Sequence, residues 1–552
     1  MERTEPVGAQ LSAVENPGRR VLVLAPPGCG KTEVLAMRAQ HLLENGRVRP
    51  GRRLLAMTFT NRARDNLRNR LVSQLGPDRV RASVTVANFH EISARLLEAH
   101  HRTIGLATPP SIARAAWQRR AFAEIAGSLP TWQSKSLLDT LKREPLTDEA
   151  LASRLRSAGD PIAERFQQRL LEEGFAAYGD LQRYAQQILR NDRVAALFQE
   201  HFDAILVDEF QDLSSQQFDI AMRLCSKDWT YVGDPYQGIF GWAGADPLSV
   251  HTKLRDEADE IINLDVSFRS SPAVLAVVNA TSADLGAAPL RAANPDKWRA
   301  GGQAYASAYP TREAEAAAIA KLTDYLAEKY PNDTVAVICR TEPRREALKD
   351  VYASASYQPQ YWDIALDTPR IAKLLKAHAR AVPDTDPFVE QVARLRDSVL
   401  SAISSVDVET VQEAHDACDQ ILAWDTAGES VRALVARIRD HQVVSAISPG
   451  VHVLNAHVGK GQQFDWVIVM GLEEGHVPDY RSKTAPQVLE DHRVLLVMLS
   501  RARQGLFLTR SESHTNQYGR AFADPASRWW PGMAQACSPM SPPVRKLMSS
   551  DY

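Results

Sequence analysis

Cysteine is scarce in this sequence, and its copies stand far apart. There are five, and no two form a C-x-x-C pair; they are Cys29, Cys225, Cys339, Cys418 and Cys537. This spacing argues against a structural zinc site, an iron–sulfur cluster and a disulfide framework. It favours a reducing compartment, and we therefore expect a cytoplasmic protein.

Long apolar runs are missing as well. No stretch of about 18 apolar residues occurs, which argues against a membrane-spanning helix. The opening segment, MERTEPVGAQ, has charges and proline where a secretory signal peptide has an apolar run. We therefore expect neither export nor a membrane partner.

An excess of positive charge is the third absence. The 65 basic and 67 acidic residues leave a formal net charge of −2, so the chain has no overall cationic field to attract nucleic acid. Any nucleic-acid contact has to come from a local channel. The chain has 552 residues, of which 44% are hydrophobic, and this length suggests roughly three or four globular domains.

Short apolar strands alternate with helical segments along the chain. We predict strands at 21–24, 54–57, 204–207, 230–232, 335–338, 451–454 and 467–470. Such alternation is typical of α/β proteins whose parallel sheets are covered on both faces. The Ala-, Leu- and charge-rich stretches 93–199 and 356–448 indicate helical insertions, and residues 513–552 indicate an irregular tail.

A phosphate-binding loop follows the first predicted strand. The segment APPGCGKT, residues 25–32, runs from a strand into a helix, and its glycines let backbone N–H groups turn toward phosphates. We expect Lys31 to reach the β- and γ-phosphates and Thr32 to bind Mg²⁺. A lone GKT triplet also occurs by chance, and the strict pattern begins with glycine instead of Ala25. Cys29 is either an acidic thiol at a helix N-terminus or simply a small loop residue.

Two acids, Asp208 and Glu209, follow the third predicted strand. Ligands of open parallel sheets bind at the carboxyl ends of the strands, so we expect this pair beside the phosphate loop. A carboxylate there holds Mg²⁺, and its neighbour takes a proton from the attacking water. A solvated acidic pair is the alternative, but the apolar run before it and the phosphate loop together favour an NTPase.

The motifs of the chain resemble those of the UvrD/Rep/PcrA group of superfamily 1A DNA helicases. The resemblance extends from Gln10 to about Arg503, in the family's order. Besides Gln10 and the phosphate loop, the matching segments are 58–63, 87–92, 208–212, 232–245, 264–270, 457–464, 471–475, 490–493 and 500–503.

The resemblance implies a fold and an activity. The fold is α/β, with two RecA-like parallel-sheet domains that each carry a helical insertion. Domain 1A takes residues 1–92 and 200–263, 1B takes 93–199, 2A takes 264–355 and 449–512, and a reduced 2B takes 356–448. The implied enzyme is a DNA-dependent ATPase that uses ATP and Mg²⁺ to move 3′ to 5′ along single-stranded DNA and to act at single/double-strand junctions.

The resemblance also assigns roles to residues. It gives the hydrolysis chemistry to Lys31, Asp208, Glu209, Gln237, Arg269 and Arg501, with Gln237 sensing the γ-phosphate and the arginines stabilising its charge. It gives Mg²⁺ to Thr32 and Asp208. It gives ATP contacts to Gln10, Pro27, Gly28, Cys29, Gly30, Lys31, Thr32, Phe268, Gly461 and Gln463. It gives DNA contacts, in which aromatic faces stack on bases, to Thr58, Phe59, Thr60, Asn61, His90, Phe240, Trp242 and His457.

Besides Ala25, several positions depart from the family pattern, among them Ser500 in place of a threonine. Glu33 stands where an arginine usually covers the adenine, and Gln463 where a glutamate contacts the ribose. Gly241 and Ala243 replace both arginines of the family's YRWRGA segment. These replacements predict a weaker grip on the DNA strand or a looser coupling between DNA and ATP.

The short 356–448 insertion leaves the biological role open, because the family uses its 2B subdomain to touch duplex DNA. One reading is a stand-alone translocase and helicase of repair or replication restart. Another is the DNA-sensing ATPase subunit of a Gabija-type anti-phage complex, which unwinds weakly and works with a separate nuclease partner. A third is a nucleotide-gated scaffold without turnover.

Overall fold

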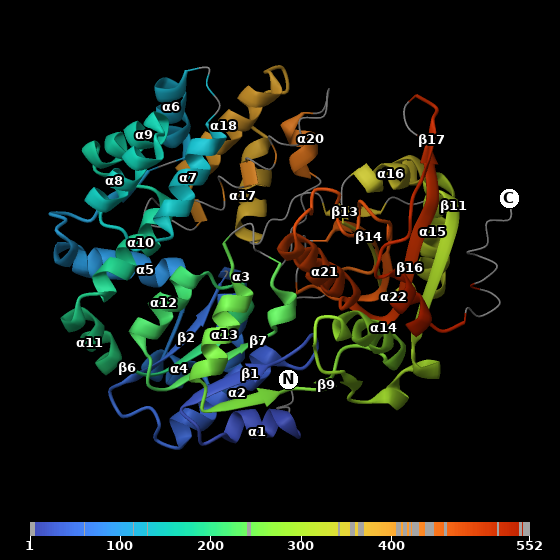
Figure 1. The fold of residues 1–552 in the computed structure, drawn as a ribbon, viewed down its shortest axis with the longest axis horizontal. Helices are drawn as coiled ribbons and strands as arrows, with labels where there is room; N and C mark the ends of the chain where they lie inside the picture. Colours follow the sequence, from blue (N-terminus) through green and yellow to red (C-terminus); the bar gives the residue numbers. More distant parts are fainter. Residues whose placement is uncertain are drawn as a thin grey trace.

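The computed structural model has two halves, each built on a parallel β-sheet with helices packed around it (Figure 1). The first sheet lies at the lower left of Figure 1 and the second on the right. This arrangement confirms the predicted α/β class with two parallel-sheet domains. The structure describes residues 6–59, 61–113, 115–127, 129, 131–239, 244–340, 343–353, 359–362, 369–403, 410–411, 414, 417–418, 421, 430–436, 447–456, 461–515, 518–539 and 544.

The first sheet contains six parallel strands in the order β3-β2-β6-β7-β1-β8. Their bounds are β1 Arg20–Leu24, β2 Arg53–Thr58, β3 Val84–Asn88, β6 Phe202–Asp208, β7 Trp229–Gly233 and β8 Glu260–Asn263. The four predicted strands are β1, β2, β6 and β7, which are almost wholly buried. β8 escapes prediction because it is a largely exposed edge strand without a buried apolar run.

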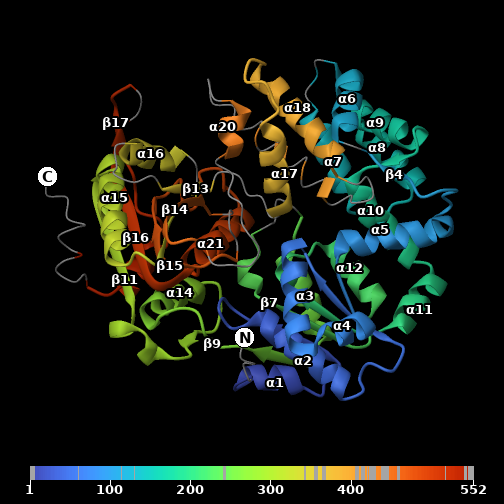
Figure 2. The ribbon, with the colours of Figure 1, turned by 180° about the vertical axis from the view of Figure 1, so that it is seen from behind.

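Alternate side chains of the first sheet point into two separate cores. Val21 and Val23 face one core and Leu22 the other, as the two-residue period of a strand requires. In Figure 2, α2, α3 and α4 cover the face of the sheet turned toward the viewer, whereas α12 lies behind. The helices around this sheet are α1 Ala9–Glu15, α2 Lys31–Glu44, α3 Asn61–Leu75, α4 Pro77–Ser83, α5 Phe89–His100, α12 Ser215–Leu224 and α13 Pro247–Glu257.

The predicted first insertion is helical, but it does not pack as one body. Leu151 and Phe166, on the stretch from α6 to α9, share a core of their own, whereas Leu181 and Tyr184 of α10 belong to the core of the first sheet. Its elements are η1 His101–Ile104, β4 Ser111–Ile112, α6 Ala115–Ala126, α7 Trp132–Lys142, α8 Asp148–Ala158, α9 Pro161–Glu172, β5 Phe175–Ala176, α10 Tyr178–Leu189 and α11 Asp192–His201.

The second sheet has the order β11-β16-β15-β12-β14-β13, with β17 added antiparallel to β16. Its strands are β11 Gln303–Thr311, β12 Thr334–Cys339, β13 Gln360–Trp362, β14 Gly450–Asn455, β15 Phe464–Val469, β16 Ala502–Thr515 and β17 Ala521–Ala523. β12, β14 and β15 are the three predicted strands. Around the sheet lie α14 Pro272–Ala283, α15 Arg312–Lys329, α16 Glu346–Ala353, α21 Ala485–Leu499 and α22 Trp530–Ala536.

The chain after residue 512 is more ordered than predicted. β16 continues to Thr515, β17 pairs with it, and α22 packs on α14 with Met533 buried. The expectation of an irregular tail is therefore wrong for these residues. Their serine and proline content does not prevent Met533 from packing into the hydrophobic core. The second insertion contains α17 Pro369–Ala379, α18 Phe388–Ser401 and α20 Val431–Ala436, which share a small core of their own.

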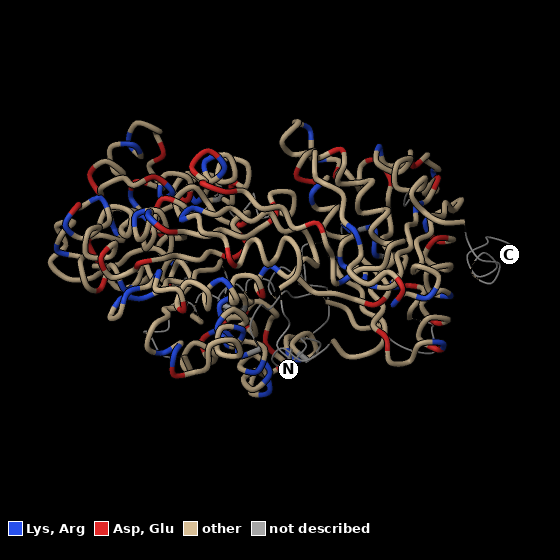
Figure 3. The backbone as a smooth tube through the Cα atoms, turned by 90° about the horizontal axis from the view of Figure 1, so that it is seen from below, with Lys and Arg blue, Asp and Glu red and all other residues tan. Residues whose placement is uncertain are grey.

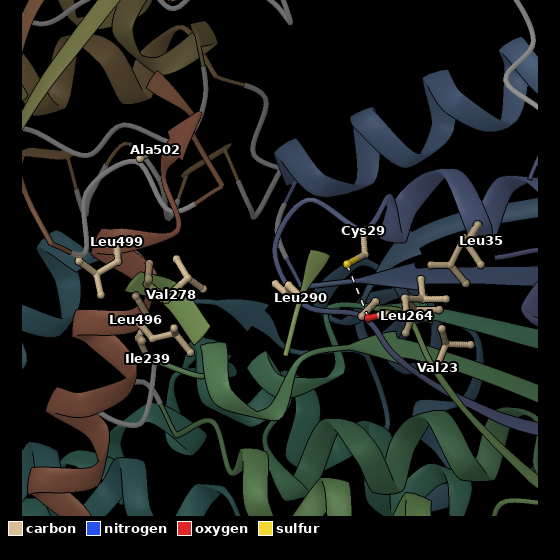
Figure 4. Close-up of a cluster of buried hydrophobic side chains, with 14 of the residues drawn as sticks. Val23, Cys29, Leu35, Ile239, Leu264, Val278, Leu290, Leu496, Leu499 and Ala502 are labelled. Carbon is tan, nitrogen blue, oxygen red and sulfur yellow. Dashed lines mark hydrogen bonds between the residues drawn. The ribbon is translucent and has the colours of Figure 1, made fainter. Parts of the chain in front are cut away.

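The two halves meet through a continuous apolar cluster. Ile239 of the first half lies beside Leu496 of α21 and Val278 of α14 in the second half (Figure 4). Basic and acidic residues are both scattered over the whole molecule (Figure 3), as the near-zero net charge leads one to expect. Among the described residues, no helix is long and apolar enough to cross a membrane.

Candidate ATP and DNA site

The phosphate loop connects β1 to α2. Gly28 and Gly30 have φ of 83° and 82°, a left-handed conformation that glycine adopts without steric cost. Lys31 Nζ donates to the Ala25 carbonyl at 2.8 Å, so the lysine arches back over the loop that would hold the phosphates. Gln10 of α1 donates from Nε2 to the Cys29 carbonyl at 2.9 Å and so touches the loop from outside.

Thr32 and the two acids meet the loop at the end of β6. The Thr32 hydroxyl donates to Asp208 Oδ2 at 2.8 Å, and Lys31 Nζ lies 3.8 Å from Glu209 Oε2. Burial, together with the nearby Glu209 charge, raises the pKa of Asp208 to about 7. Glu209 has φ of 54°, a strained conformation for a residue with a side chain and one that often marks functional sites.

The Thr32–Asp208 pair fits a Mg²⁺ ion. Mg²⁺ prefers oxygen ligands and usually takes one or two from the protein, with the remainder from phosphates and water. A cation beside Asp208 would favour its charged form, which burial disfavours. Within the described part of the chain, no three His, Cys, Asp or Glu side chains are grouped to hold a metal ion by themselves. Phosphates of a bound nucleotide and water would supply the remaining ligands of such a site.

A hydrogen-bonded chain that the sequence reasoning missed joins Glu209 to Gln237. Gln211 lies in η2 Phe210–Asp212. Its side-chain Nε2 donates to Glu209 Oε2 at 2.6 Å, and its side-chain Oε1 accepts from the Asp234 backbone N–H at 3.0 Å. The carboxylate of Asp234 in turn accepts from Gln237 Nε2 at 2.6 Å, in η3 Pro235–Gln237. The predicted base and the predicted γ-phosphate sensor are therefore linked through two buried residues.

The second half closes over the phosphate loop. A methyl group placed on Gly28 would lie 2.5 Å from Ser267 Oγ and 2.6 Å from Arg269 Cβ, and the Phe268 N–H donates to the Gly28 carbonyl at 2.9 Å. Burial lowers the pKa of Arg269 to about 10, while the charge of Glu209 acts against that shift. The Phe268 side chain is 46% exposed beside the loop, as a ring that stacks on adenine has to be.

Two arginines come from the segment around α21. Arg501 is buried, which lowers its pKa to about 9, and one of its Nη groups donates to the Ala456 carbonyl. Arg493 was not assigned a role from the sequence. Its pKa is lowered by burial, and the charges of Glu490 and Asp234 oppose that shift, which places Arg493 near the chain that leads to Gln237.

The surroundings of Cys29 do not favour an acidic thiol. Its side chain is buried, and burial raises the pKa of the thiol to about 12. The Sγ atom points toward the Leu264 carbonyl, 3.7 Å away (Figure 4). The loss of solvation outweighs the nearby charge of Lys31, which favours a small loop residue over an acidic thiol.

The remaining predicted ATP contacts lie around the loop or on the second half. Pro27 is buried in the loop, and Gly461 and Gln463 are exposed just before β15. Glu33, which replaces the family's arginine, forms an ion pair with Arg70 of α3 at 3.0 Å. A guanidinium is therefore present on this side of α2, although it comes from another helix.

The predicted DNA contacts are only partly within the described residues. Thr58 is fully buried at the end of β2, and its hydroxyl has no hydrogen-bond partner among the described residues, so its side chain does not face outward. The His90 ring stacks on Tyr178 at 4.3 Å and lies 3.0 Å from Gln182 Nε2. Phe59 is half-buried at the turn before α3. The Asn61 side chain and Thr60, Phe240, Trp242 and His457 lie outside the described residues, and their DNA contacts stay predictions.

The fold and the site define a class of protein. The phosphate loop of one parallel-sheet domain contacts Arg269 of the second half, an arrangement that fits an α/β P-loop NTPase with two RecA-like domains. The family model of the UvrD/REP helicase N-terminal domain matches residues 7–257, and that of the UvrD-like helicase C-terminal domain matches residues 353–513. The chain therefore belongs to the UvrD-type superfamily 1A helicases and is a DNA-dependent ATPase of that family.

Similar proteins are found among bacterial helicases. The chain is 27% identical over 556 residues to "ATP-dependent DNA helicase UvrD2" of Mycobacterium tuberculosis, covering 91% of this chain and 78% of the relative. It is 30% identical over 296 residues to "ATP-dependent DNA helicase PcrA" of Leuconostoc citreum, covering 49% and 38%. It is 29% identical over 290 residues to "DNA helicase II" of Escherichia coli, covering 49% and 39%.

Proposed function

We propose that this protein is an ATP-driven translocase and helicase that moves 3′ to 5′ on single-stranded DNA. The observation that carries the proposal is the contact between Gly28 of the phosphate loop and Ser267 and Arg269 of the second half. A nucleotide at this interface would bridge the two halves, so its hydrolysis would change how they pack. Such a hinge, with alternating grip on a strand, produces stepping.

The proposed chemistry uses the phosphate loop, the groups around it and Arg501 of the second half. Thr32 and Asp208 hold Mg²⁺, which neutralises the phosphates, and Lys31 orients them. Glu209 accepts the proton of the attacking water. Gln237, which Asp234 holds by a hydrogen bond, contacts the γ-phosphate. Arg269 and Arg501 stabilise the charge that develops as the phosphate bond breaks.

We also propose domain limits and substrates. The limits are 1A at 1–92 and 200–263, 1B at 93–199, 2A at 264–355 and 449–512, and 2B at 356–448. The substrates are single-stranded DNA and single/double-strand junctions, and the protein acts in the cytoplasm. The packing of α10 with the first sheet argues for a functional boundary of 1B that lies inside these limits.

Steady-state ATP hydrolysis tests the proposal. We expect strong stimulation of kcat by an unstructured oligothymidylate and little by blunt duplex. Glu209→Gln should lower the stimulated kcat by roughly 100-fold to 10,000-fold while ATP binding persists, because the change removes a base and keeps the shape. Two results would contradict the proposal. One is ATP hydrolysis by the wild-type chain that does not increase with single-stranded DNA, and the other is full activity of Glu209→Gln.

A second candidate function follows from the small 356–448 insertion, of which the described helices are α17, α18 and α20. It is a DNA-sensing ATPase subunit of a Gabija-type anti-phage complex that acts with a separate nuclease. A strand-displacement assay distinguishes the two candidate functions. Efficient unwinding of a 3′-tailed duplex by the purified chain favours the stand-alone helicase, whereas stimulated ATP hydrolysis without unwinding favours the complex.

A further inference from the structure

The segment 232–245 lacks the two arginines that its family counterpart carries, since Gly241 and Ala243 stand in their places. If the protein moves on DNA, as proposed above, this segment needs cationic groups from elsewhere to hold phosphates. The structure offers one such group at Gly244, the next residue along the chain.

Arg143 lies against Gly244. A methyl group built on Gly244 would stand 2.6 Å from Arg143 Cζ and 2.9 Å from Nη1, so the guanidinium occupies the space that a side chain would fill. Gly244 has φ of 93°, which also favours glycine. Arg143 belongs to the first insertion, 101 residues earlier in the chain by numbering (143 against 244), so the sequence alone gives no sign of this contact.

The backbone of Arg143 is held firmly. It directly follows α7, and its N–H donates to the Thr140 carbonyl. The preceding Lys142 forms a buried ion pair with Asp180 at 2.6 Å, and the Lys142 carbonyl accepts from Gln216 Nε2 of α12 at 3.1 Å. These contacts fix the end of α7, and with it the backbone from which the Arg143 side chain extends.

The side chain of Arg143 is nevertheless available to a ligand. It is exposed, whereas Arg154 of the same insertion is paired with Glu144 at 3.1 Å. Asp139 of α7 is close enough for the Arg143 charge to act on it, but among the residues that the structure describes Arg143 forms no ion pair. A planar guanidinium with free N–H groups is suited to bind a phosphate diester with two parallel hydrogen bonds.

The loop that Arg143 touches leads to the ATP site. Asp246, two residues after Gly244, donates its N–H to the Leu213 carbonyl at 2.9 Å. Leu213 directly follows η2, which contains Gln211. Gln211 contacts Glu209 and the Asp234 backbone. A ligand bound to Arg143 is therefore connected to the proposed base, Glu209, through a few covalent and hydrogen bonds.

We propose that Arg143 is a DNA-phosphate contact, supplied by the first insertion in place of the missing arginines of the 232–245 segment. The inference rests on the proposed function. The ligand is the sugar–phosphate backbone of a single strand, and the contact is independent of base sequence.

Fluorescence anisotropy with a labelled oligothymidylate tests the inference on the full-length chain. Arg143→Ala should weaken binding about tenfold, the usual loss for one charge-assisted hydrogen-bonded contact. The slope of log affinity against log salt should become shallower by about 0.7, because one fewer counterion is released from single-stranded DNA. The concentration of DNA that gives half-maximal ATPase stimulation should rise in parallel.

Arg165→Ala is the matched control, because Arg165 is an exposed arginine on α9 of the same insertion. It should bind as the wild type does. Adding Ala243→Arg to Arg143→Ala should restore affinity by returning a guanidinium to the family position.

The inference is overturned if Arg143→Ala binds DNA within about twofold of the wild type, or if Arg165→Ala loses as much affinity. In either case a wild-type chain that is stimulated by DNA leaves the proposed function intact. A wild-type chain that neither binds the oligonucleotide nor responds to it overturns the proposed function itself. An unchanged melting temperature of Arg143→Ala establishes that lost binding is not lost folding.

Discussion

Gln211 is the residue on which the arrangement of the ATP site depends most, although it is not among the residues assigned from the sequence. It is fully buried and holds Glu209 with one end of its amide and the Asp234 backbone with the other. Both contacts are made to groups whose position matters for hydrolysis. We regard Gln211 as a positioning residue for the proposed base.

Replacing Gln211 with alanine should therefore lower the DNA-stimulated kcat by roughly 10-fold to 100-fold, the loss expected for a hydrogen bond to a charged group. The KM for ATP should change little, because Gln211 itself is not expected to touch the nucleotide. Gln217→Ala is the control, since Gln217 is also buried but accepts from the Ser214 N–H at the start of α12. Equal kcat values for the two variants would refute the role of Gln211.

At the scale of elements, a buried ion cluster ties together segments of the second half. Arg344, in η7 Pro343–Arg345, contacts Glu315 of α15 and donates from Nε to Glu473 Oε2 at 3.1 Å. Glu473 follows β15, and the Ser511 hydroxyl of β16 donates to it at 3.1 Å. Burial raises the pKa of Glu315, while the charge of Arg344 acts against that shift. One guanidinium therefore compensates two buried carboxylates.

Arg344→Met should destabilise the protein by about 3–5 kcal/mol, because it removes the positive charge that compensates those two buried carboxylates. The matched control is Arg154→Met, whose exposed pair with Glu144 should be worth less than about 1 kcal/mol. Urea denaturation followed by tryptophan fluorescence gives both values. If Arg344→Met lowers the free energy of unfolding no more than the control does, the cluster contributes nothing to stability.

Prediction of individual elements succeeds where the sequence carries an apolar run and fails where it does not. β6 and β12 are buried along nearly their whole length and are evident from their side chains. The edge strand β8 is largely exposed and carries no such run. β16 has a short buried run at Leu506–Leu508, but the polar stretch TRSESHT that follows hides the length of the strand. α22 is missed because a single buried Met533 and its flanking residues give too little periodicity.

At the scale of the whole molecule, the proposed mechanism couples ATP to motion through the interface at Gly28. Its missing side chain leaves room for Ser267 and Arg269 to approach the loop. Gly28→Ala should reduce kcat strongly, since a Cβ would force the halves apart and strain the loop as well. Gly46→Ala is the control, because Gly46 also has a positive φ, of 69°, but nothing lies within 4 Å of the place that its Cβ would take.

Comparing Gly28→Ala with Gly46→Ala separates the effect of backbone strain from that of a steric clash between the halves. Both variants carry the cost of alanine in a left-handed conformation, about 1 kcal/mol or more. Only the Gly28 variant adds a clash across the interface, so its kcat should fall far more than its melting temperature. Equal activity of the two variants would mean that the halves need not close at Gly28 during turnover.

The sequence by itself determined the chemical groups of this protein. The phosphate loop, the Asp208–Glu209 pair and the order of the motifs are local patterns, and local patterns are legible because neighbours in sequence are neighbours in space. The tertiary structure decided which distant groups meet: Gln211 with Asp234, Gly28 with Arg269, and Arg143 with Gly244. Those pairs depend on strand order and on how helices of an insertion return to the sheet, and both are properties of the packed chain as a whole.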